Sequence, residues 1–398
     1  MKQVNVKTMR AVPQNGGDMY DCIVIGAGIA GAVAARKLAE EKGKRVLVME
    51  RRPHIGGNCY DEKDAHGILI HNYGPHIFHT GLEEVFAYLS RFTDWYLFGH
   101  EVVAKVGEQL IPVPFNLNTL HMVYGKEKAD RLEQKLIETY GEGSRVPIMK
   151  LRENEDADIR EIAQYVYENV FLYYTMKQWG QKPEEIDPAT TARVPVFLSR
   201  DDRYFQDAYQ GMPLEGYTPM FERMLAHPNI TVELGCDALE RLDVSGDTLR
   251  VDGEPFAGPV IYTGQADELF RFRFGPLPYR TLNFQFETLP RDDFQGYGTV
   301  NYTVDREYTR ITEFKHLTGQ VLPGKTTIVK EYSKAYGGIL GEIPYYAIIN
   351  PANRALYDRY RGLAEHFGNL HLLGRLAEYQ YYNMDAIAAR ALDLAERL

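Results

Sequence analysis

Three glycines near the N-terminus are spaced for binding a phosphorylated ligand. Gly26, Gly28 and Gly31 form a Gly-x-Gly-x-x-Gly pattern that follows the short apolar run 22–25. In this pattern the first glycine permits a tight turn, the second lets the backbone approach a pyrophosphate, and the third lets a helix pack closely on a strand. The helix that begins here would offer free N–H groups and the positive end of its dipole to the phosphates. The pattern therefore predicts a dinucleotide site.

An acidic residue ends the next apolar run. Glu50 follows residues 46–49, roughly 20 residues after the glycines, where a carboxylate can accept hydrogen bonds from an adenosine ribose. A carboxylate there would repel a 2′-phosphate, which disfavours NADP. A glycine turn without a ligand is the structural alternative, but two strands, a helix and the acid in this order favour the dinucleotide site.

Two further segments favour FAD over NAD. Residues 50–57 follow a Glu-(x)5-Gly-Gly pattern similar to the stretch that passes close to FAD in flavoproteins. Residues 373–375 lie between an apolar run and the last helical pattern, in the region that meets the flavin in that superfamily; an ordinary turn is the alternative. The expected FAD-binding residues are Gly26, Gly28, Gly31, Glu50, Arg51, Gly57, Asn58, His76, Gly264, Gly374, Arg375, Met384 and Asp385.

Apolar patterns place these residues in an α/β framework. A strand at 22–25, a helix that ends at Gly43 and a strand that ends at Glu50 form a βαβ unit, which requires a parallel sheet. The C-terminus adds a buried strand and a final helix. Since α/β pieces lie at both ends, we expect an α/β fold in which an FAD-binding Rossmann-like domain is interrupted by a helical domain and an antiparallel β-sheet domain.

The expected boundaries follow changes in pattern along the chain. Residues 116–180 have helical periodicity, with one helix over 118–140 and another capped by Asp158. Residues 180–216 are proline-rich and aperiodic, which is typical of a functional lid. The predicted divisions are an N-terminal extension at 1–19, an FAD-binding domain at 20–94 plus 217–275 plus 350–398, a helical domain at 116–180, and an antiparallel sheet domain at 95–115 plus 181–216 plus 276–349 with the mobile lid at 180–216.

Composition excludes several classes of protein. The 398 residues are 44% hydrophobic and 25% charged, with 45 basic and 55 acidic side chains and a net charge of −10. This balance is ordinary for a globular protein and opposes nonspecific binding to nucleic acid or anionic membranes. No apolar run is long enough to span a bilayer. Three scattered cysteines fit a reducing cytoplasm, and no thiolate or carboxylate completes a metal-ligand spacing with the histidines of 71–79.

Several other motifs closely resemble those of one family, the bacterial UDP-galactopyranose mutases. The resemblance extends from about residue 20 to the C-terminus. Its motifs are GPHIFHT (74–80), VPFNLNT (113–119), KQWG (177–180), RVPVF (193–197), TRITEFKH (309–316), PYY (344–346) and LGRLAEYQYYNMD (373–385).

The resemblance implies a reaction, a cofactor and an assembly. The family's mutases are intramolecular transferases that interconvert UDP-galactopyranose and UDP-galactofuranose, with FAD active only when reduced and no net redox change. N5 of the reduced flavin attacks the anomeric carbon, UDP leaves, and the sugar ring opens and recloses before UDP returns. The product would supply galactofuranose for cell-surface glycans. The family also implies a homo-oligomer, commonly a dimer.

The resemblance assigns roles to individual residues. Arg193 on the lid and Arg310 on a strand would clamp the diphosphate, because arginine makes forked hydrogen bonds to such groups, and His79 beside the flavin would complete the catalytic set. Tyr174 would stack on uracil. The other expected substrate contacts are Trp179, Tyr204, Tyr345, Tyr346, Tyr381, His100 and Asn383.

Some assignments stay open on the sequence alone. Tyr174 is not separable from Tyr173, nor Tyr345 from Tyr346, and each of the 28 tyrosines could simply pack in the core. His100 and Asn383 stand where other members commonly have Asn and Asp, so fine contacts to the sugar differ.

Two other function classes compete. A flavin-dependent amine oxidase or desaturase would not need paired arginines or a platform for uracil. A non-catalytic protein that escorts prenylated GTPases would lack the glycine and glutamate set.

Overall fold

The computed structural model describes residues 20–180, 182, 195–304, 306–339 and 341–398. The N-terminal extension and residues 181 and 183–194 of the predicted lid, including Arg193, lie outside the described residues. Within them, no helix combines the length and apolar character needed to cross a bilayer.

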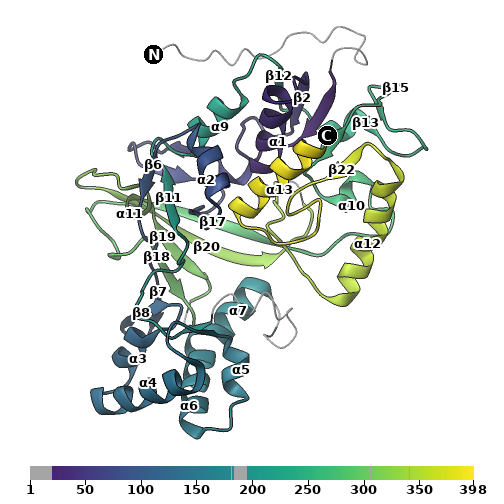
Figure 1. Cartoon of the computed structure of the whole chain (residues 1–398). Coiled ribbons are helices and arrows are strands. Elements are labelled where there is room, and N and C mark those ends of the chain that lie inside the picture. The colour runs from purple at the N-terminus through teal and green to yellow at the C-terminus, as the bar shows by residue number, and fades with distance from the viewer. Residues whose placement is uncertain (1–19, 181, 183–194, 305, 340) are drawn as a thin grey trace.

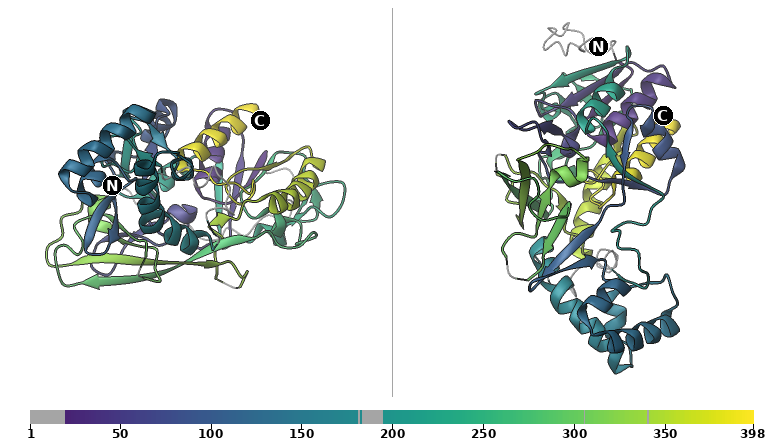
Figure 2. Two further views of the ribbon diagram at one scale, coloured as in Figure 1. Left: turned by 90° about the horizontal axis from the view of Figure 1, so that it is seen from below. Right: turned by 90° about the vertical axis from the view of Figure 1, so that its left-hand side faces the viewer.

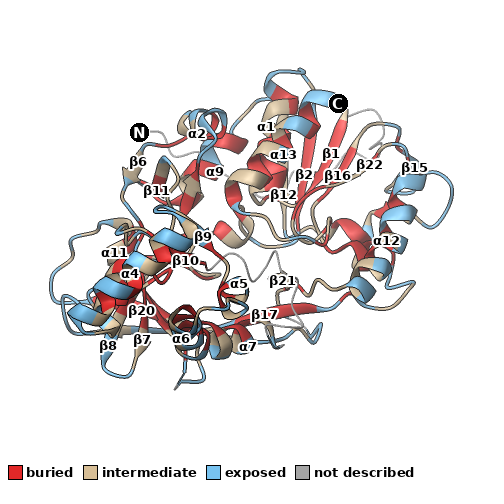
Figure 3. Cartoon of the chain, turned by 60° about the horizontal axis from the view of Figure 1, so that its bottom comes forward, coloured by how far each residue is buried: buried red, intermediate tan, exposed pale blue. Residues whose placement is uncertain are grey.

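A five-stranded parallel sheet forms one end of the molecule (Figure 1). Every neighbouring pair in it is parallel. Its strands, in spatial order, are β12 (Ile230–Leu234), β2 (Val46–Glu50), β1 (Cys22–Ile25), β16 (Val260–Tyr262) and β22 (Leu370–Leu372). The central strands are buried (Figure 3), as expected for a parallel sheet with both faces covered.

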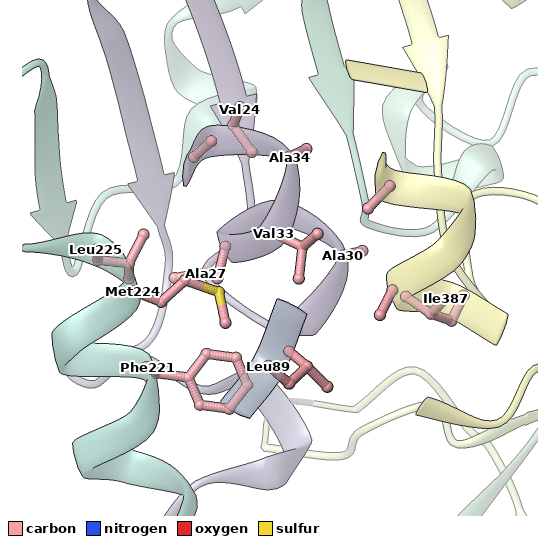
Figure 4. Close-up of a cluster of buried hydrophobic side chains, with 14 of the residues drawn as sticks. Val24, Ala27, Ala30, Val33, Ala34, Leu89, Phe221, Met224, Leu225 and Ile387 are labelled. Atoms are coloured by element: carbon pink, nitrogen blue, oxygen red, sulfur yellow. The ribbon is translucent and has the colours of Figure 1, made fainter. Parts of the chain in front are cut away.

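Small residues let a helix lie close to one face of this sheet. Helix α1 (Ile29–Glu40) is rich in alanine and packs with α9 (Tyr217–Leu225), α13 (Met384–Arg397) and α2 (Glu83–Ser90). Figure 4 shows Ala30 and Val33 of α1 among Leu89, Phe221 and Ile387 of the covering helices. The opposite face is covered by α10 (Ala266–Leu269), α12 (Pro351–His366), the turn η5 (Ala238–Glu240) and the strands β13 (Leu242–Asp243) and β14 (Arg250–Val251). Strand β15 (Glu254–Pro255) pairs with β14 and is exposed.

A seven-stranded sheet crosses the middle of the molecule (Figures 1 and 2). It is antiparallel except where β18 pairs with β7. Its order is β21 (Tyr346–Ala347), β17 (Tyr279–Leu289), β20 (Thr326–Ala335), β19 (Arg310–Glu313), β18 (Thr299–Tyr302), β7 (Val102–Val106) and β8 (Gln109–Val113). A small antiparallel sheet of β5 (Phe78–Thr80), β11 (Tyr209–Pro213) and β6 (Trp95–Leu97) lies beside it. Short elements complete this region: β3 (Asp61–Lys63), β4 (Leu69–His71), η2 (Gly57–Cys59) and α11 (Phe314–Thr318).

The helical region at the far end corrects two details of the sequence prediction. The helix expected over 118–140 is two helices, α3 (Leu117–Val123) and α4 (Lys126–Tyr140), which are interrupted at Gly125. Asp156, not Asp158, caps α6 (Ala157–Val166), because its carboxylate accepts from the N–H groups of Asp158 and Ile159.

A π turn at Tyr167–Phe171 joins α6 to α7 (Leu172–Trp179). The region also contains α5 (Ile148–Arg152) and the strand pair β9 (Arg145–Val146) and β10 (Val196–Phe197).

The α/β fold expected from the sequence is confirmed. The parallel sheet draws its strands from chain segments separated by the other two regions, as an interrupted Rossmann-like fold requires. The individual domain boundaries stay a prediction.

Candidate active site

A cavity of about 800 Å³ opens where the three regions meet. Aromatic and polar side chains from segments far apart in sequence form its wall. They are Tyr73, Gly74, Pro75, His76, Ile77, His79, His100, Val102, Arg145, Tyr174, Tyr204, Phe205, Gln206, Asp207, Leu282, Thr299, Asn301, Arg310, Tyr345, Tyr346, Arg375, Tyr381, Tyr382, Asn383, Met384 and Ala386.

The glycine turn outside this cavity has no room for side chains. A Cβ on Gly31 would lie 1.9 Å from the carbonyl oxygen of Gly26, and a Cβ on Gly57 would lie 2.9 Å from the Cα of Gly28. No side chain caps the N-terminus of α1 at Gly28. The turn therefore offers bare backbone N–H groups at a helix N-terminus, which fits a pyrophosphate.

Glu50 is fixed beside this turn at the end of β2. Its two carboxylate oxygens accept from the N–H groups of Ala27 (2.8 Å) and Arg52 (2.9 Å). Each oxygen has a further lone pair, so the side chain retains the capacity to accept from a ribose hydroxyl.

The two arginines that follow Glu50 have different partners. Arg51 makes two hydrogen bonds of 3.0 Å to Glu268, so its guanidinium is held by a carboxylate. Arg52 instead donates to Asn58 and lies over the ring of Tyr73, and its buried Nη1 has no partner among the described residues. Arg52 therefore contacts Tyr73 of the cavity wall, a contact that the sequence did not predict.

Segments from the two ends of the chain meet between the turn and the cavity. Gly374 has φ +104°, and a Cβ there would contact Ala30 of α1. The thiol of Cys59 lies 3.6 Å from the sulfur of Met384, the first residue of α13. The N-cap of α13, Asn383, makes no side-chain capping bond and lies in the cavity wall. The bare turn, Glu50 and this second uncapped helix terminus together fit an extended dinucleotide.

Arg310 is a half-buried cation in the cavity wall, where its side chain is 25% exposed. Its Nε donates to Glu331 at 2.6 Å across paired strands β19 and β20, and the Glu331 side chain is 1% exposed. Burial opposes the charge, but Glu331 and the phenols of Tyr174 and Tyr346 outweigh it and raise the pKa of Arg310 above its ordinary value. Since only Nε is engaged within the described residues, the two terminal nitrogens are available to a ligand oxygen.

Tyrosines surround this arginine. Tyr174 lies in the cavity wall, whereas Tyr173 is 45% exposed on the outside of α7. The rings of Tyr346 and Tyr381 stack with centroids 6.0 Å apart, and Trp179 contacts Tyr346 at 5.5 Å. Burial raises the pKa of Tyr346 to about 12, so its phenol stays protonated and can donate a hydrogen bond.

Three of the nearby histidines are neutral by burial. Burial, with Arg375 and His71 nearby, lowers the pKa of His76 to about 3. Burial, with Arg310 nearby, lowers the pKa of His100 to about 3, and burial lowers that of His71 to about 4. His79 differs from these three histidines in its partner. Its Nδ1 lies 2.7 Å from a carboxylate oxygen of Asp207.

Comparison with known proteins assigns the family. Residues 169–381 match the family model of UDP-galactopyranose mutase, and residues 24–92 match that of NAD(P)-binding Rossmann-like domains. A probable UDP-galactopyranose mutase of Klebsiella pneumoniae is 37% identical over 94% of this chain and 93% of its own length. The chain belongs to the UDP-galactopyranose mutase family.

Other relatives agree with this assignment. A UDP-galactopyranose mutase of Mycoplasma pneumoniae is 36% identical over 95% of this chain and 96% of its own, and a dTDP-fucopyranose mutase of Escherichia coli is 34% identical over 95% and 98%. An (S)-6-hydroxynicotine oxidase of Paenarthrobacter nicotinovorans matches only 24% of each chain. The family predicted from the motifs is therefore confirmed, and the amine-oxidising alternative shares only a minor part of the sequence.

Solved structures share the fold. The crystal structure of a reduced UDP-galactopyranose mutase superimposes with a TM-score of 0.71 at 15% identity, over 95% of this chain and 93% of that one. A cyclohexylamine oxidase from Brevibacterium oxydans gives 0.55 at 15% identity, over 95% and 99%. These two structures share the fold of this member of the UDP-galactopyranose mutase family.

The cavity gathers most of the residues that the family resemblance assigned. They are His76, His79, His100, Tyr174, Tyr204, Arg310, Tyr345, Tyr346, Arg375, Tyr381, Asn383 and Met384. Trp179, Gly264, Gly374 and Asp385 do not line it, and Arg193 lies outside the described residues. The role of each stays a prediction.

Several residues at the cavity had no assignment from the sequence. Arg145, Asp207 and Asn301 line the cavity, and Glu331 lies beneath Arg310. Only the strand patterns VNYTV (300–304) and RITEF (310–314) gave any signal, and neither specifies which face of a strand meets a ligand.

Proposed function

We propose that this protein interconverts UDP-galactopyranose and UDP-galactofuranose, with FAD as cofactor and its reduced form as the active state. The observation that carries the proposal is a single cavity that contains both the uncapped end of α13 and Arg310, which is held by Glu331. One end of this cavity suits a flavin and the other suits a diphosphate.

The cofactor would be held by the N-terminus of α1, the end of β2 and the start of α13. Gly28, Gly31 and the N-terminus of α1 would take the pyrophosphate, and Glu50 the adenosine ribose. The start of α13 at Met384 would direct partial positive charge to the flavin end. When bound and reduced, the flavin would supply a nucleophilic nitrogen for the anomeric carbon of the sugar.

Arg310 would stabilise the departing diphosphate. Glu331 engages Nε and fixes the plane of the guanidinium, so the terminal nitrogens present two donors in a set orientation. In a chain of net charge −10, this local cation is needed to bind an anionic nucleotide. Arg193 remains the proposed second cation.

Aromatic residues would hold the nucleotide and the sugar. Tyr174 offers a ring for uracil, and stacking of a base on such a ring contributes about 1–3 kcal/mol. Tyr346 and Tyr381 would donate to phosphate oxygens, while His100 and Asn383 would contact the sugar. Because His100 is neutral, it offers one donor and one acceptor.

A second substrate has specific support. The dTDP-fucopyranose mutase of E. coli covers the chain almost completely, so the same ring rearrangement on a deoxythymidine nucleotide is the alternative. The two substrates differ at the sugar C6 hydroxyl, the ribose 2′-hydroxyl and the base methyl group.

The test is turnover by the flavin-loaded, dithionite-reduced protein. We expect UDP-galactofuranose to be converted to UDP-galactopyranose, detected by chromatography, with no conversion by the oxidised protein. Parallel reactions with dTDP-fucopyranose distinguish the two substrates by their kcat/KM. Equal activity of the fully oxidised protein would contradict the proposal.

We also propose a cytoplasmic homo-oligomer. The cysteines of the described residues are all free thiols, which suits a reducing compartment, and the family resemblance supports the assembly. Light scattering of the purified protein measures its mass in solution.

A further inference from the structure

A carboxylate and an aromatic ring fix His79 in the cavity wall. Oδ2 of Asp207 lies 2.7 Å from Nδ1 of His79, and the ring of Phe205 stacks on the imidazole with centroids 3.6 Å apart and an interplanar angle of 11°. The side chains of His79 and Asp207 are 11% and 36% exposed, so the pair opens into the cavity.

The segment that supplies both contacts is itself held in place. Gln210 is the cross-strand partner of His79 in the pairing of β5 with β11. Its amide nitrogen donates to the carbonyl oxygens of Phe205 (2.9 Å) and Asp207 (3.0 Å), and the Gln210 side chain is buried. The sheet thus positions the imidazole and its two partners as one unit.

This arrangement is specific to His79 among the cavity histidines. Nδ1 of His76 contacts the carbonyl oxygen of Gly74, and the His100 ring packs near Phe205 without a carboxylate partner. Both are neutral through burial. His79 alone among the described cavity histidines pairs with an acid.

We propose that Asp207 is a positioning residue that sets the tautomer of His79 for proton transfer during the sugar rearrangement. An ionised carboxylate only accepts hydrogen bonds, so the neutral imidazole of His79 carries its proton on Nδ1 and keeps the lone pair on Nε2. Among the side-chain hydrogen bonds of the described residues, His79 takes part through Nδ1 and not through Nε2.

The reaction requires such a group, if the proposed function holds. A pyranose ring closes through the oxygen on C5 and a furanose ring through the oxygen on C4. Each conversion to the furanose therefore removes a proton from the C4 hydroxyl and adds one to the C5 oxygen. Nε2 of His79 takes up one proton and returns one, while the resulting imidazolium is stabilised by Asp207, so protons balance over the cycle.

The decisive experiment pairs spectroscopy with kinetics on the flavin-loaded protein. Histidine labelled with ¹⁵N in the ring distinguishes the two tautomers, and a His79→Gln variant assigns the signals. In wild type we expect a protonated Nδ1 and an unprotonated Nε2. In Asp207→Asn the amide can donate to Nδ1, so we expect the opposite tautomer, a fall in kcat of about 10², and a KM within about twofold of wild type because the substrate-binding groups are unchanged.

Asp293→Asn is the matched control. It breaks another carboxylate–histidine pair, between Asp293 and His316 at 3.1 Å, which does not line the cavity. We expect wild-type kcat and an unchanged His79 signal.

An unchanged tautomer in Asp207→Asn, or a changed tautomer with wild-type kcat, would overturn the proposal. The spectra are recorded without substrate, so the positioning of His79 is tested even if wild type fails to convert UDP-sugars and the proposed function is wrong.

Discussion

Replacing Gly31 by alanine tests the cofactor turn most directly. The added Cβ would lie 1.9 Å from the carbonyl oxygen of Gly26 and 3.0 Å from Val24. Since the nearer contact is backbone, α1 must retreat by about 1 Å, and overpacking of this kind costs about 1–3 kcal/mol. Alanine in a helix gains only about 1 kcal/mol over glycine, so we expect net destabilisation.

The same shift should weaken flavin binding more than it weakens the fold. A retreat of α1 moves the N–H groups of its first turn away from the pyrophosphate, and each hydrogen bond to a charged group contributes about 1.5–3 kcal/mol. Loss of one such bond corresponds to at least about a tenfold rise in Kd. Flavin absorbance relative to protein absorbance, and titration of the apoprotein with FAD, measure this change.

Gly362→Ala is the matched control. Gly362 lies in α12, where an added Cβ would meet no atom within 4 Å. We expect normal flavin content and a small gain in the free energy of unfolding. If Gly31→Ala retains wild-type flavin content and thermal stability, the steric account of the turn is wrong.

Three further predictions concern the cavity. In the double variant Arg310→Ala, Glu331→Gln, the second change avoids leaving a buried charge unpaired. We expect kcat to fall by about 10²–10³ and the flavin spectrum to be retained. Wild-type turnover in this variant would show that Arg310 has no part in the reaction. Tyr174→Ala should raise KM for the UDP-sugar by about tenfold, since about 1–3 kcal/mol of stacking is lost, and a fall in kcat at constant KM would contradict the stacking role. Burial lowers the pKa of His100 to about 3 in the folded protein. As the pH falls below about 6.5, the unfolded chain therefore binds a proton on this imidazole before the folded protein does, and the free energy of unfolding falls. The free energy of unfolding, measured with urea, should therefore fall between pH 7 and pH 5 by about 2 kcal/mol less in His100→Asn than in wild type. An equal fall in the variant and in wild type would refute this account.

The sequence predicted the cofactor turn because its requirements are local. Gly26, Gly28 and Gly31 are neighbours along the chain, and the need for absent side chains is visible in the residue types themselves. The order of strand, turn, helix and strand then predicts parallel strands joined by a right-handed crossover. The family motifs likewise depend only on residue order, which is why most of the assigned residues could be named in advance.

The ends and caps of the helices were harder to predict from the sequence, because neighbouring residues of similar type fit the same pattern. Gly125 divides what appeared as one periodic segment, and Asp156 caps α6 although Asp158 satisfies the same sequence pattern. The π turn before α7 adds a residue to the helical repeat, so periodicity alone did not establish that Tyr174 faces the cavity and Tyr173 faces outward.

Tertiary structure alone decided which groups share the cavity. His79 and Asp207 are far apart in sequence and meet because β5 pairs with β11, and Glu331 reaches Arg310 because β20 lies beside β19. Arg51 and Arg52 are indistinguishable by type, yet Glu268 from another segment holds the first, whereas the second lies over Tyr73 of the cavity wall. Residue types and local spacing thus determined what this protein can bind, whereas strand register, which depends on packing of the whole chain, determined which side chains act together.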